Sequence, residues 1–265
     1  MRPLLLIVFL GSLTSCAEHD DDKPVWSDGQ WIDLTHSFDE HTIYWPTSDL
    51  FRLDTVSEGI TDSGYYYAAF KFCTAEHGGT HLDAPVHFAE GKHAMDEIPV
   101  DRLIGEAIVM DVSEKALQNP DYQVSVADFE QWESTNGPLP DDAIVLIYTG
   151  YSRFWPDPLK YMGTLERGVE AVALLHFPGL DPEAARWLVL NRSIKAIGLD
   201  TPSIDYGQSK LFESHRILFE ENIPAFENIA NLERLPSTGA FLVALPMKIK
   251  GGSGGPLRIV AFLPE

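Results

Sequence analysis

The stretch Thr74–His87, TAEHGGTHLDAPVH, decides how this 265-residue chain is organised. It carries His77, His81, Asp83 and His87 within eleven positions. Between them, residues 77–87 have small and apolar neighbours instead of the Lys, Glu and Ser of a solvated loop. Imidazole nitrogens and carboxylate oxygens are the donors that suit Zn²⁺, Mn²⁺ or Fe²⁺. The stretch therefore predicts a metal site.

The backbone of this stretch is predicted to be a strand end or a tight loop. Gly78-Gly79 and Pro85 disfavour a helix. In a strand, alternate residues lie on one face, so His81 and Asp83 would project together. His77 could join them through a kink at the two glycines.

Composition and charge narrow the classes of function. The chain is 45% hydrophobic, which is ordinary for a globular protein, and its length fits one large domain or two small ones. It has 19 basic and 40 acidic residues and a formal charge of −21. That balance disfavours binding to nucleic acid or to an anionic membrane surface, and it weakly favours retention of divalent cations.

The N-terminus predicts export. Residues 1–15 contain a charged start and an apolar run, Leu4–Leu10, that is far too short to span a bilayer. The Leu-Thr-Ser-Cys ending resembles a bacterial lipobox, which makes Cys16 the predicted lipidated residue, residues 16–30 a tether and residues 31–265 the folded domain. An ordinary secretory signal cut near Ala17 and a buried N-terminal strand are the alternatives. We expect a lipoprotein facing the periplasm or the cell exterior, in contact with the membrane only through its lipid.

The cysteines allow no disulfide framework. Only Cys16 and Cys73 occur, so lipidation of the first leaves one thiol. Cys73 could be a metal ligand or a nucleophile, but its apolar neighbours favour a small buried side chain.

The remaining pattern predicts one mixed α/β domain in which strands outnumber helices. Strands are expected over residues 31–36, 65–74, 105–112, 143–149, 194–200, 239–245 and 257–262; helices are expected from 125, over 181–191 and over 209–220. The glycine-rich segment 251–255 is expected to join the last two strands flexibly.

Further candidate site residues lie far from the metal stretch. His215 falls among the apolar positions of its predicted helix, and Glu227 lies between aromatic and aliphatic neighbours. A charged side chain is seldom buried unless it is paired or bound to a metal, so together these two could close the site. Tyr44 and Trp45 precede Pro46 in an extended segment and are candidates for a substrate wall, although core packing is the commoner fate of such rings.

The run His77–Phe88, HGGTHLDAPVHF, resembles the HxGTHxDxPxHF signature of the cyclase family, which includes kynurenine formamidases (arylformamidases) and isatin hydrolases. The similarity covers nearly all of the chain after the signal, with further markers that include the runs 32–36, 44–46 and 198–205. The resemblance implies the family's swivelling β/β/α fold, an α/β domain with a barrel-like sheet. It also implies a homo-oligomer, a dimer or a tetramer.

The resemblance assigns a role to each candidate. It makes His77, His81 and Asp83 the primary metal ligands, His215 and Glu227 the ligands of a second position, His87 the proton donor and acceptor, and Trp45 a substrate contact, with Tyr44 and Phe88 beside it. Family members use a pair of Zn²⁺ ions or a single Mn²⁺.

The implied reaction is metal-dependent hydrolysis of a non-peptide amide C–N bond, by attack of metal-bound hydroxide with His87 as general acid and base. The substrate would be a small aromatic amide. N-formylkynurenine belongs to tryptophan catabolism, normally inside the cell, so an isatin-like cyclic amide better suits an exported enzyme. A metal-dependent lyase or dehydratase, and a non-catalytic metal- or ligand-binding lipoprotein, are the rivals.

Overall fold

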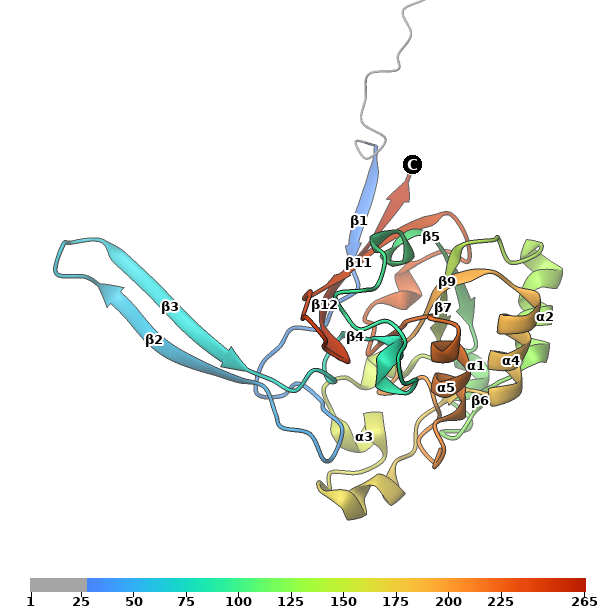
Figure 1. Ribbon diagram of the computed structural model, residues 1–265, viewed down its shortest axis with the longest axis horizontal. Coiled ribbons are helices and arrows are strands. Elements are labelled where there is room, and N and C mark those ends of the chain that lie inside the picture. The colour runs from blue at the N-terminus through green and yellow to red at the C-terminus, as the bar shows by residue number, and fades with distance from the viewer. Residues whose placement is uncertain (1–27) are drawn as a thin grey trace, which may run out of the picture.

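Seven strands close into a barrel at the centre of the protein, as the computed structural model of residues 28–265 shows (Figure 1). In barrel order the strands are β12 (Gly254–Pro264), β11 (Ala240–Pro246), β5 (Ile104–Asp111), β7 (Ala143–Tyr148), β9 (Ile194–Leu199), β10 (Ala225–Glu227) and β4 (His81–Asp83). Pairing of β4 with β12 closes the ring. The predicted barrel-like α/β fold is therefore confirmed.

The ring has one block of parallel strand pairs and one block of antiparallel pairs. β5, β7, β9 and β10 run parallel to one another, whereas the pairs that involve β4, β11 and β12 are antiparallel. β1 (Gly29–Asp33) lies outside the ring on the edge of β12. The parallel strands are buried on both faces, which explains why β7 is the continuous apolar run AIVLIY.

Two cores follow from the alternation of side chains along the barrel strands. Ile144 and Leu146 of β7 point into the barrel, whereas Val145 and Ile147 face the helices. The helices are α1 (Ser113–Ala116), α2 (Val126–Asn136), α3 (Pro158–Met162), α4 (Pro182–Asn191) and α5 (Glu213–Glu220). Of these, α2, α4 and α5 cover the outer face of the parallel block (Figure 1).

Short elements complete the domain. A small sheet joins β6 (Gln123–Val124) to β8 (Gly179–Leu180), and the 3₁₀ turns are η1 (Pro85–His87), η2 (Val100–Leu103), η3 (Tyr151–Phe154), η4 (Val169–Leu174) and η5 (Leu232–Arg234). A long hairpin of β2 (Arg52–Ile60) and β3 (Tyr66–Cys73) projects away from the barrel (Figure 1). No helix within residues 28–265 combines the length and the apolar character needed to cross a membrane.

Several sequence predictions hold locally because the signal is local. α2 begins behind the capping box of Ser125 and Asp128, and α4 begins behind Asp181 with Pro182 in its first turn. The signal peptide of residues 1–15, the lipidation of Cys16 and most of the tether lie outside the described residues and stay predictions. The described part begins its first strand at Gly29, inside the predicted tether of residues 16–30.

Three sequence predictions are wrong. Gly254 and Gly255 belong to β12 and pair with β4, so the glycine segment is not a flexible connection throughout; a Cβ at Gly254 would lie 2.4 Å from Cε1 of His77. The third helix begins at Glu213 and not at residue 209, because Phe212 before it adopts φ 47°. Cys73 is exposed, because it is the last residue of β3, a strand that no other element of residues 28–265 covers.

Candidate metal centre and active site

The register between β4 and β10 assembles the first part of the site. These antiparallel strands place Glu227 directly opposite His81 and Ala225 opposite Asp83. Opposed residues on antiparallel strands share a face, so Glu227 joins the face that His81 and Asp83 already share. Nε2 of His81 lies 3.0 Å from Oδ1 of Asp83 and 3.4 Å from Oε2 of Glu227. All three side chains are buried.

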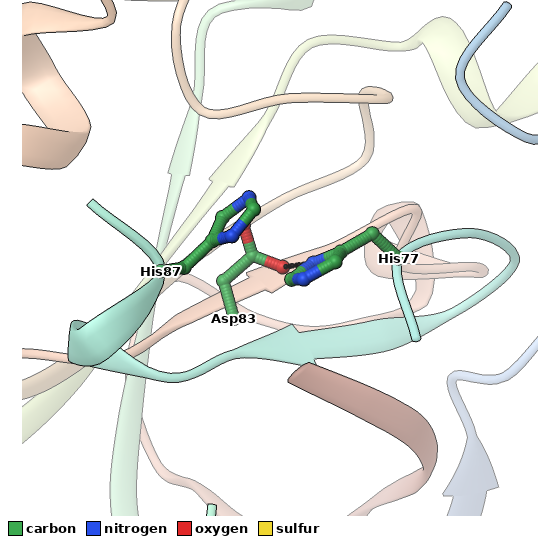
Figure 2. Close-up of side chains that lie close together, drawn as sticks. All are labelled: His77, Asp83 and His87. Carbon is green, nitrogen blue, oxygen red and sulfur yellow. Dashed lines mark hydrogen bonds and ion pairs between the residues drawn. The ribbon is translucent and has the colours of Figure 1, made fainter. Parts of the chain in front are cut away.

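The loop before β4 adds His77. Its Nδ1 lies 2.7 Å from Oδ1 of Asp83, as the dashed line in Figure 2 shows. Gly78 permits this fold of the loop, because a Cβ there would lie 2.0 Å from Cδ1 of Tyr44. The predicted kink at the glycines is what brings His77 to the centre.

The turn after β4 adds His87. It ends η1, and its ring stacks on that of His77 with the centroids 3.8 Å apart. Figure 2 shows both imidazoles directed toward Asp83. The sequence-adjacent part of the candidate site therefore converges on one carboxylate.

α5 adds His215 from more than a hundred residues away. Nε2 of His215 lies 3.1 Å from Oε1 of Glu227 and 3.4 Å from Oδ2 of Asp83. Its Nδ1 donates to Oδ2 of Asp205 at 2.5 Å. The second predicted pair, His215 and Glu227, thus lies beside the first set of residues, on the other oxygen of Asp83.

Within residues 28–265, two groups of side chains have the spacing of metal ligands. One is His77, Asp83 and His87, and the other is His81, Asp83 and Glu227. Asp83 belongs to both, which is the position of a bridging carboxylate. Because His87 is a member of the first group, the geometry admits it as a metal ligand as well as a proton carrier.

Each predicted imidazole ligand has its outward nitrogen held by another group. Nδ1 of His81 donates to the carbonyl of Gly79 at 2.9 Å, and Nδ1 of His215 donates to Asp205. Nε2 of His77 lies 2.9 Å from Oγ of Ser253, which itself donates to Oε2 of Glu76. Such outer partners fix the ring orientation and the tautomer of metal-binding histidines. They leave Nε2 of His81 and His215 and Nδ1 of His77 facing the centre.

Nε2 of His81 is the direct test of whether a cation fits. It is fully buried and makes no hydrogen bond, although two carboxylates lie within 3.4 Å. A buried polar atom without a hydrogen-bond partner is rare and calls for an explanation. A divalent cation that accepts this lone pair and those carboxylate oxygens supplies one, so the residues fit the group.

The electrostatics of the centre couple its acids to its imidazoles. Burial alone would lower the pKa of His81, but Asp83 and then Glu227 raise it to about 9. Burial also opposes ionisation of Asp83, yet the surrounding imidazoles hold its pKa well below the usual range. Burial and the charge of Asp83 raise the pKa of Glu227. The carboxylates of this centre therefore favour a bound positive charge, whether it is a proton on an imidazole or a metal cation.

A cavity of about 300 Å³ opens onto this centre. Its floor is the cluster of titratable side chains, and its walls include Tyr44, Trp45, Phe88 and Phe212. The rings of Phe88 and Phe212 stack with centroids 5.1 Å apart. This volume lies at the lower end of the range for small-molecule sites and suits a compact, flat ligand.

Sequence reasoning missed four residues of this region: Glu76, Asp205, Phe212 and Ser253. Asp205 ends the run GLDTPSID, six positions after β9 ends, and could have been marked as one of the two carboxylates in the segment that follows this strand. Glu76 and Ser253 carry no local signal, because 177 positions separate them. Phe212 gave no signal either, since its left-handed backbone depends on the turn that it closes.

Comparison with known proteins gives consistent relatives. The cyclase family model matches residues 32–206. The chain is 31% identical over 222 residues to the isatin hydrolase of Roseibium aggregatum, covering 81% of each protein, and 27% identical over 235 residues to the kynurenine formamidase of Salinibacter ruber, covering 86% of this chain and 95% of the relative.

The fold agrees with these sequence relatives. The structure of isatin hydrolase A from Labrenzia aggregata, bound to benzyl benzoate, superposes with a TM-score of 0.80 at 33% identity, over 89% of this chain and 94% of that one. The family model matches most of the chain, a sequence relative exceeds 30% identity, and the fold agrees, so sequence and structure support the same family. This chain belongs to the cyclase family.

Proposed function

We propose that this protein is a metal-dependent hydrolase that cleaves the C–N bond of a small aromatic amide, with an isatin-like cyclic amide as its preferred substrate. One observation carries the proposal: four imidazoles and two carboxylates converge at the floor of an aromatic-walled cavity. The likeness to isatin hydrolases at 31% and 33% identity supports the cyclic amide.

The cation would be held by Asp83 with His77 and His81, whose inward nitrogens lie 2.7 Å and 3.0 Å from its Oδ1. His215 and Glu227 would complete a second position that shares Asp83. Mixed imidazole and carboxylate donors suit Zn²⁺ or Mn²⁺. When bound, such a cation supplies an acidified water and polarises a carbonyl group.

His87 would carry the proton. Burial lowers its pKa to about 4, against the opposing charge of Asp83, so the imidazole is uncharged near neutrality and able to accept a proton. It lies at the mouth of the cluster between His77 and the ring of Phe88, whose centroid is 4.4 Å away. From there it could return the proton to a leaving nitrogen held between the aromatic walls.

The walls would position the substrate. Trp45 packs edge-on against Phe177, and Phe88 stacks with Phe212, so flat apolar surfaces flank the titratable floor. Stacking on such faces favours an aryl amide over an aliphatic one. The limited volume favours a bicyclic amide over one with a long side chain.

The test is to assay the metal-loaded protein on isatin and on N-formylkynurenine in parallel, with elemental analysis of the same sample. Faster hydrolysis of isatin supports the proposal. Preference for N-formylkynurenine would move the substrate to the formamidase class, for which the Salinibacter relative provides the precedent. Hydrolysis of neither would reject both substrates.

His87→Ala separates a proton carrier from a ligand. We expect kcat to fall by about 100- to 10,000-fold while the metal content stays at the wild-type value, because general acid–base catalysis contributes that much. Plasma mass spectrometry of the dialysed variant measures the metal. Loss of one ion per chain together with activity would make His87 a ligand.

A further inference from the structure

A buried amide side chain joins the two segments that carry the candidate ligands. Asn228 directly follows Glu227, the last residue of β10, and is 2% exposed. Its Nδ2 donates to the carbonyl oxygen of Gly79 at 2.8 Å. The same oxygen accepts from Nδ1 of His81 at 2.9 Å. One side chain therefore holds the carbonyl group that orients one candidate ligand, and it comes from the strand that carries another.

The backbone of Asn228 makes a second contact with the loop of residues 77–80, which is called the metal loop below. Its carbonyl oxygen accepts from Oγ1 of Thr80 at 2.7 Å, and its N–H donates to the carbonyl oxygen of Thr201 at 2.9 Å. Thr80 is fully buried and directly precedes His81. Asn228 thus contacts two consecutive residues of the metal loop, so a shift of either segment displaces the other.

The hydroxyl group of Tyr161 determines which way the amide of Asn228 points. Tyr161 lies on α3, is fully buried and donates to Oδ1 of Asn228 at 2.9 Å, with the carbonyl oxygen of Asp200 as a second acceptor at 3.1 Å. Burial raises the pKa of Tyr161 well above its ordinary value, so the hydroxyl keeps its proton and remains a donor. With a donor at one end of the amide and an acceptor at the other, Nδ2 must face Gly79.

Water cannot easily replace these contacts. Tyr161, Asn228 and Thr80 are each no more than 2% exposed. A buried polar group that loses its partner costs free energy, and hydrogen bonds in a row polarise one another. The bonds from Tyr161 through Asn228 to Gly79 therefore favour a single arrangement. A fixed outer partner of this kind is what holds the ring of a metal-binding histidine in place.

We propose that Asn228 and Tyr161 are positioning residues of the metal centre: Tyr161 orients the amide of Asn228, and that amide holds the carbonyl of Gly79 in place for His81. This inference rests on the metal centre of the proposed function and adds to it a support that spans both ligand segments. Asn228 lines the cavity, but each end of its amide has a protein partner. It therefore acts through His81 and not on the substrate.

The first test measures metal affinity without any substrate. Glycine accepts the φ of 54° that Asn228 adopts, so Asn228→Gly removes the amide without straining the backbone. Competition of the protein with a chromophoric chelator for Zn²⁺ gives the dissociation constants. We expect at least one ion to bind about 10- to 100-fold more weakly, the range for outer partners of metal-binding histidines. Tyr161→Phe keeps the ring and should weaken the same ion by up to about 10-fold, the effect of one hydrogen bond.

The double variant distinguishes two residues that act in series from two independent supports. If Tyr161 acts through Asn228, adding Tyr161→Phe to Asn228→Gly should change the dissociation constant by less than about twofold. Independent supports would instead multiply the two single effects. Tyr148→Phe is the matched control: Tyr148 is 8% exposed, and its hydroxyl accepts from Arg153 at 3.3 Å. This variant should bind Zn²⁺ as the wild type does.

Urea unfolding of the metal-free variants separates a positioning role from a structural one. A structural role alone would lower the unfolding midpoint of Asn228→Gly and leave its dissociation constants at the wild-type values. That result, or multiplied effects in the double variant, would overturn the proposal. If Asn228→Gly does not fold, Tyr161→Phe against Tyr148→Phe decides, and equal constants in those two variants would overturn it.

Failure of this inference is distinguishable from failure of the proposed reaction. A wild type that binds no Zn²⁺ would reject both, because the metal centre itself would be absent. Zn²⁺ binding that depends on Asn228, in a protein that hydrolyses neither amide, would support the positioning role and reject only the proposed substrates.

Discussion

Two histidines each carry a buried Nε2 that makes no hydrogen bond, and their surroundings separate them. His81 is the first residue of β4. His36 lies close to it in space, since its backbone N–H donates to Oγ1 of Thr80, and its ring stacks on Trp155 with centroids 4.3 Å apart. Within residues 28–265 these are the two buried side-chain polar atoms that lack a partner. The same orphan atom thus occurs in two regions of one small domain.

The carboxylates make the difference. Burial lowers the pKa of His36 to about 4, and no acid offsets that effect. His81 is buried more deeply, yet Asp83 and Glu227 raise its pKa to about 9. His36 is kept neutral by burial and faces no acid, so its surroundings offer nothing to a cation. His81 faces two carboxylates and occupies a place where a cation is stable. The comparison locates the metal centre by charge, independently of any motif.

The largest expected effect comes from Asp83→Asn, which makes the surroundings of His81 more like those of His36. The pKa of His81 should fall, and both ligand groups lose their shared carboxylate. We expect metal loss by elemental analysis and at least about 1,000-fold lower kcat/KM, since a metal contributes several kcal/mol to such catalysis. Asp128→Asn, a buried carboxylate on α2, is the control and should keep its metal. Full metal content in Asp83→Asn would refute the charge argument.

Asp205→Asn should have the next largest effect, because it weakens the carboxylate bond to the outward nitrogen of His215. Outer partners of metal-binding histidines contribute about 10- to 100-fold in metal affinity. Competition with a chromophoric chelator measures the dissociation constant of each ion. We expect the more weakly bound ion to be affected and the other to be retained; equal affinities in variant and wild type would exclude a positioning role.

His36→Phe tests the structural histidine through pH. The folded-state pKa of about 4 lies below the ordinary value of 6.5, so the unfolded chain binds more protons between these values. The stability that neutral His36 contributes is present above pH 6.5 and is lost as pH falls through 6.5 to 4. The wild type should therefore lose about 2 to 3 kcal/mol more than His36→Phe between pH 7 and pH 4. Urea unfolding at both pH values measures the difference, and parallel pH profiles would contradict it.

Ser253→Ala should have the smallest effect. His77 is 23% exposed, so water can replace the hydroxyl that holds its Nε2 and is itself held by Glu76. We expect less than about 10-fold weaker metal binding in the chelator assay, with kcat nearly unchanged. A larger loss of metal affinity in Ser253→Ala than in Asp205→Asn would contradict the expectation that the outer partner of the buried His215 matters more than that of the partly exposed His77.

Local signals predicted local structure well. The capping residues of α2 and α4 and the apolar run of β7 each determine their element within a few positions. Burial of His215 and Glu227 was predicted from their apolar neighbours and is confirmed. Gly78 and Gly79 were correctly expected to let the chain bend and direct His77 to the centre. A side chain at either position would collide with a neighbouring aromatic ring, Tyr44 or Phe38.

Signals that depend on distant partners failed. Cys73 lies in an apolar run that predicts burial, but no layer within residues 28–265 covers that strand. The glycines before β12 predicted flexibility, whereas pairing with β4 orders them. The strand β2 was not predicted. It lies in the projecting hairpin and packs against no core, so its sequence lacks the buried apolar pattern of a core strand.

The sequence by itself determined the identity of the donors, the conformation of their loop and the family to which the chain belongs, since each depends on residue types at short spacing. Only the tertiary structure decided which donors share a centre. The register of β4 against β10 places Glu227 opposite His81, and the docking of α5 brings His215 to Asp83. Those contacts join positions more than a hundred residues apart, and packing of the whole barrel, not any local preference, sets their geometry.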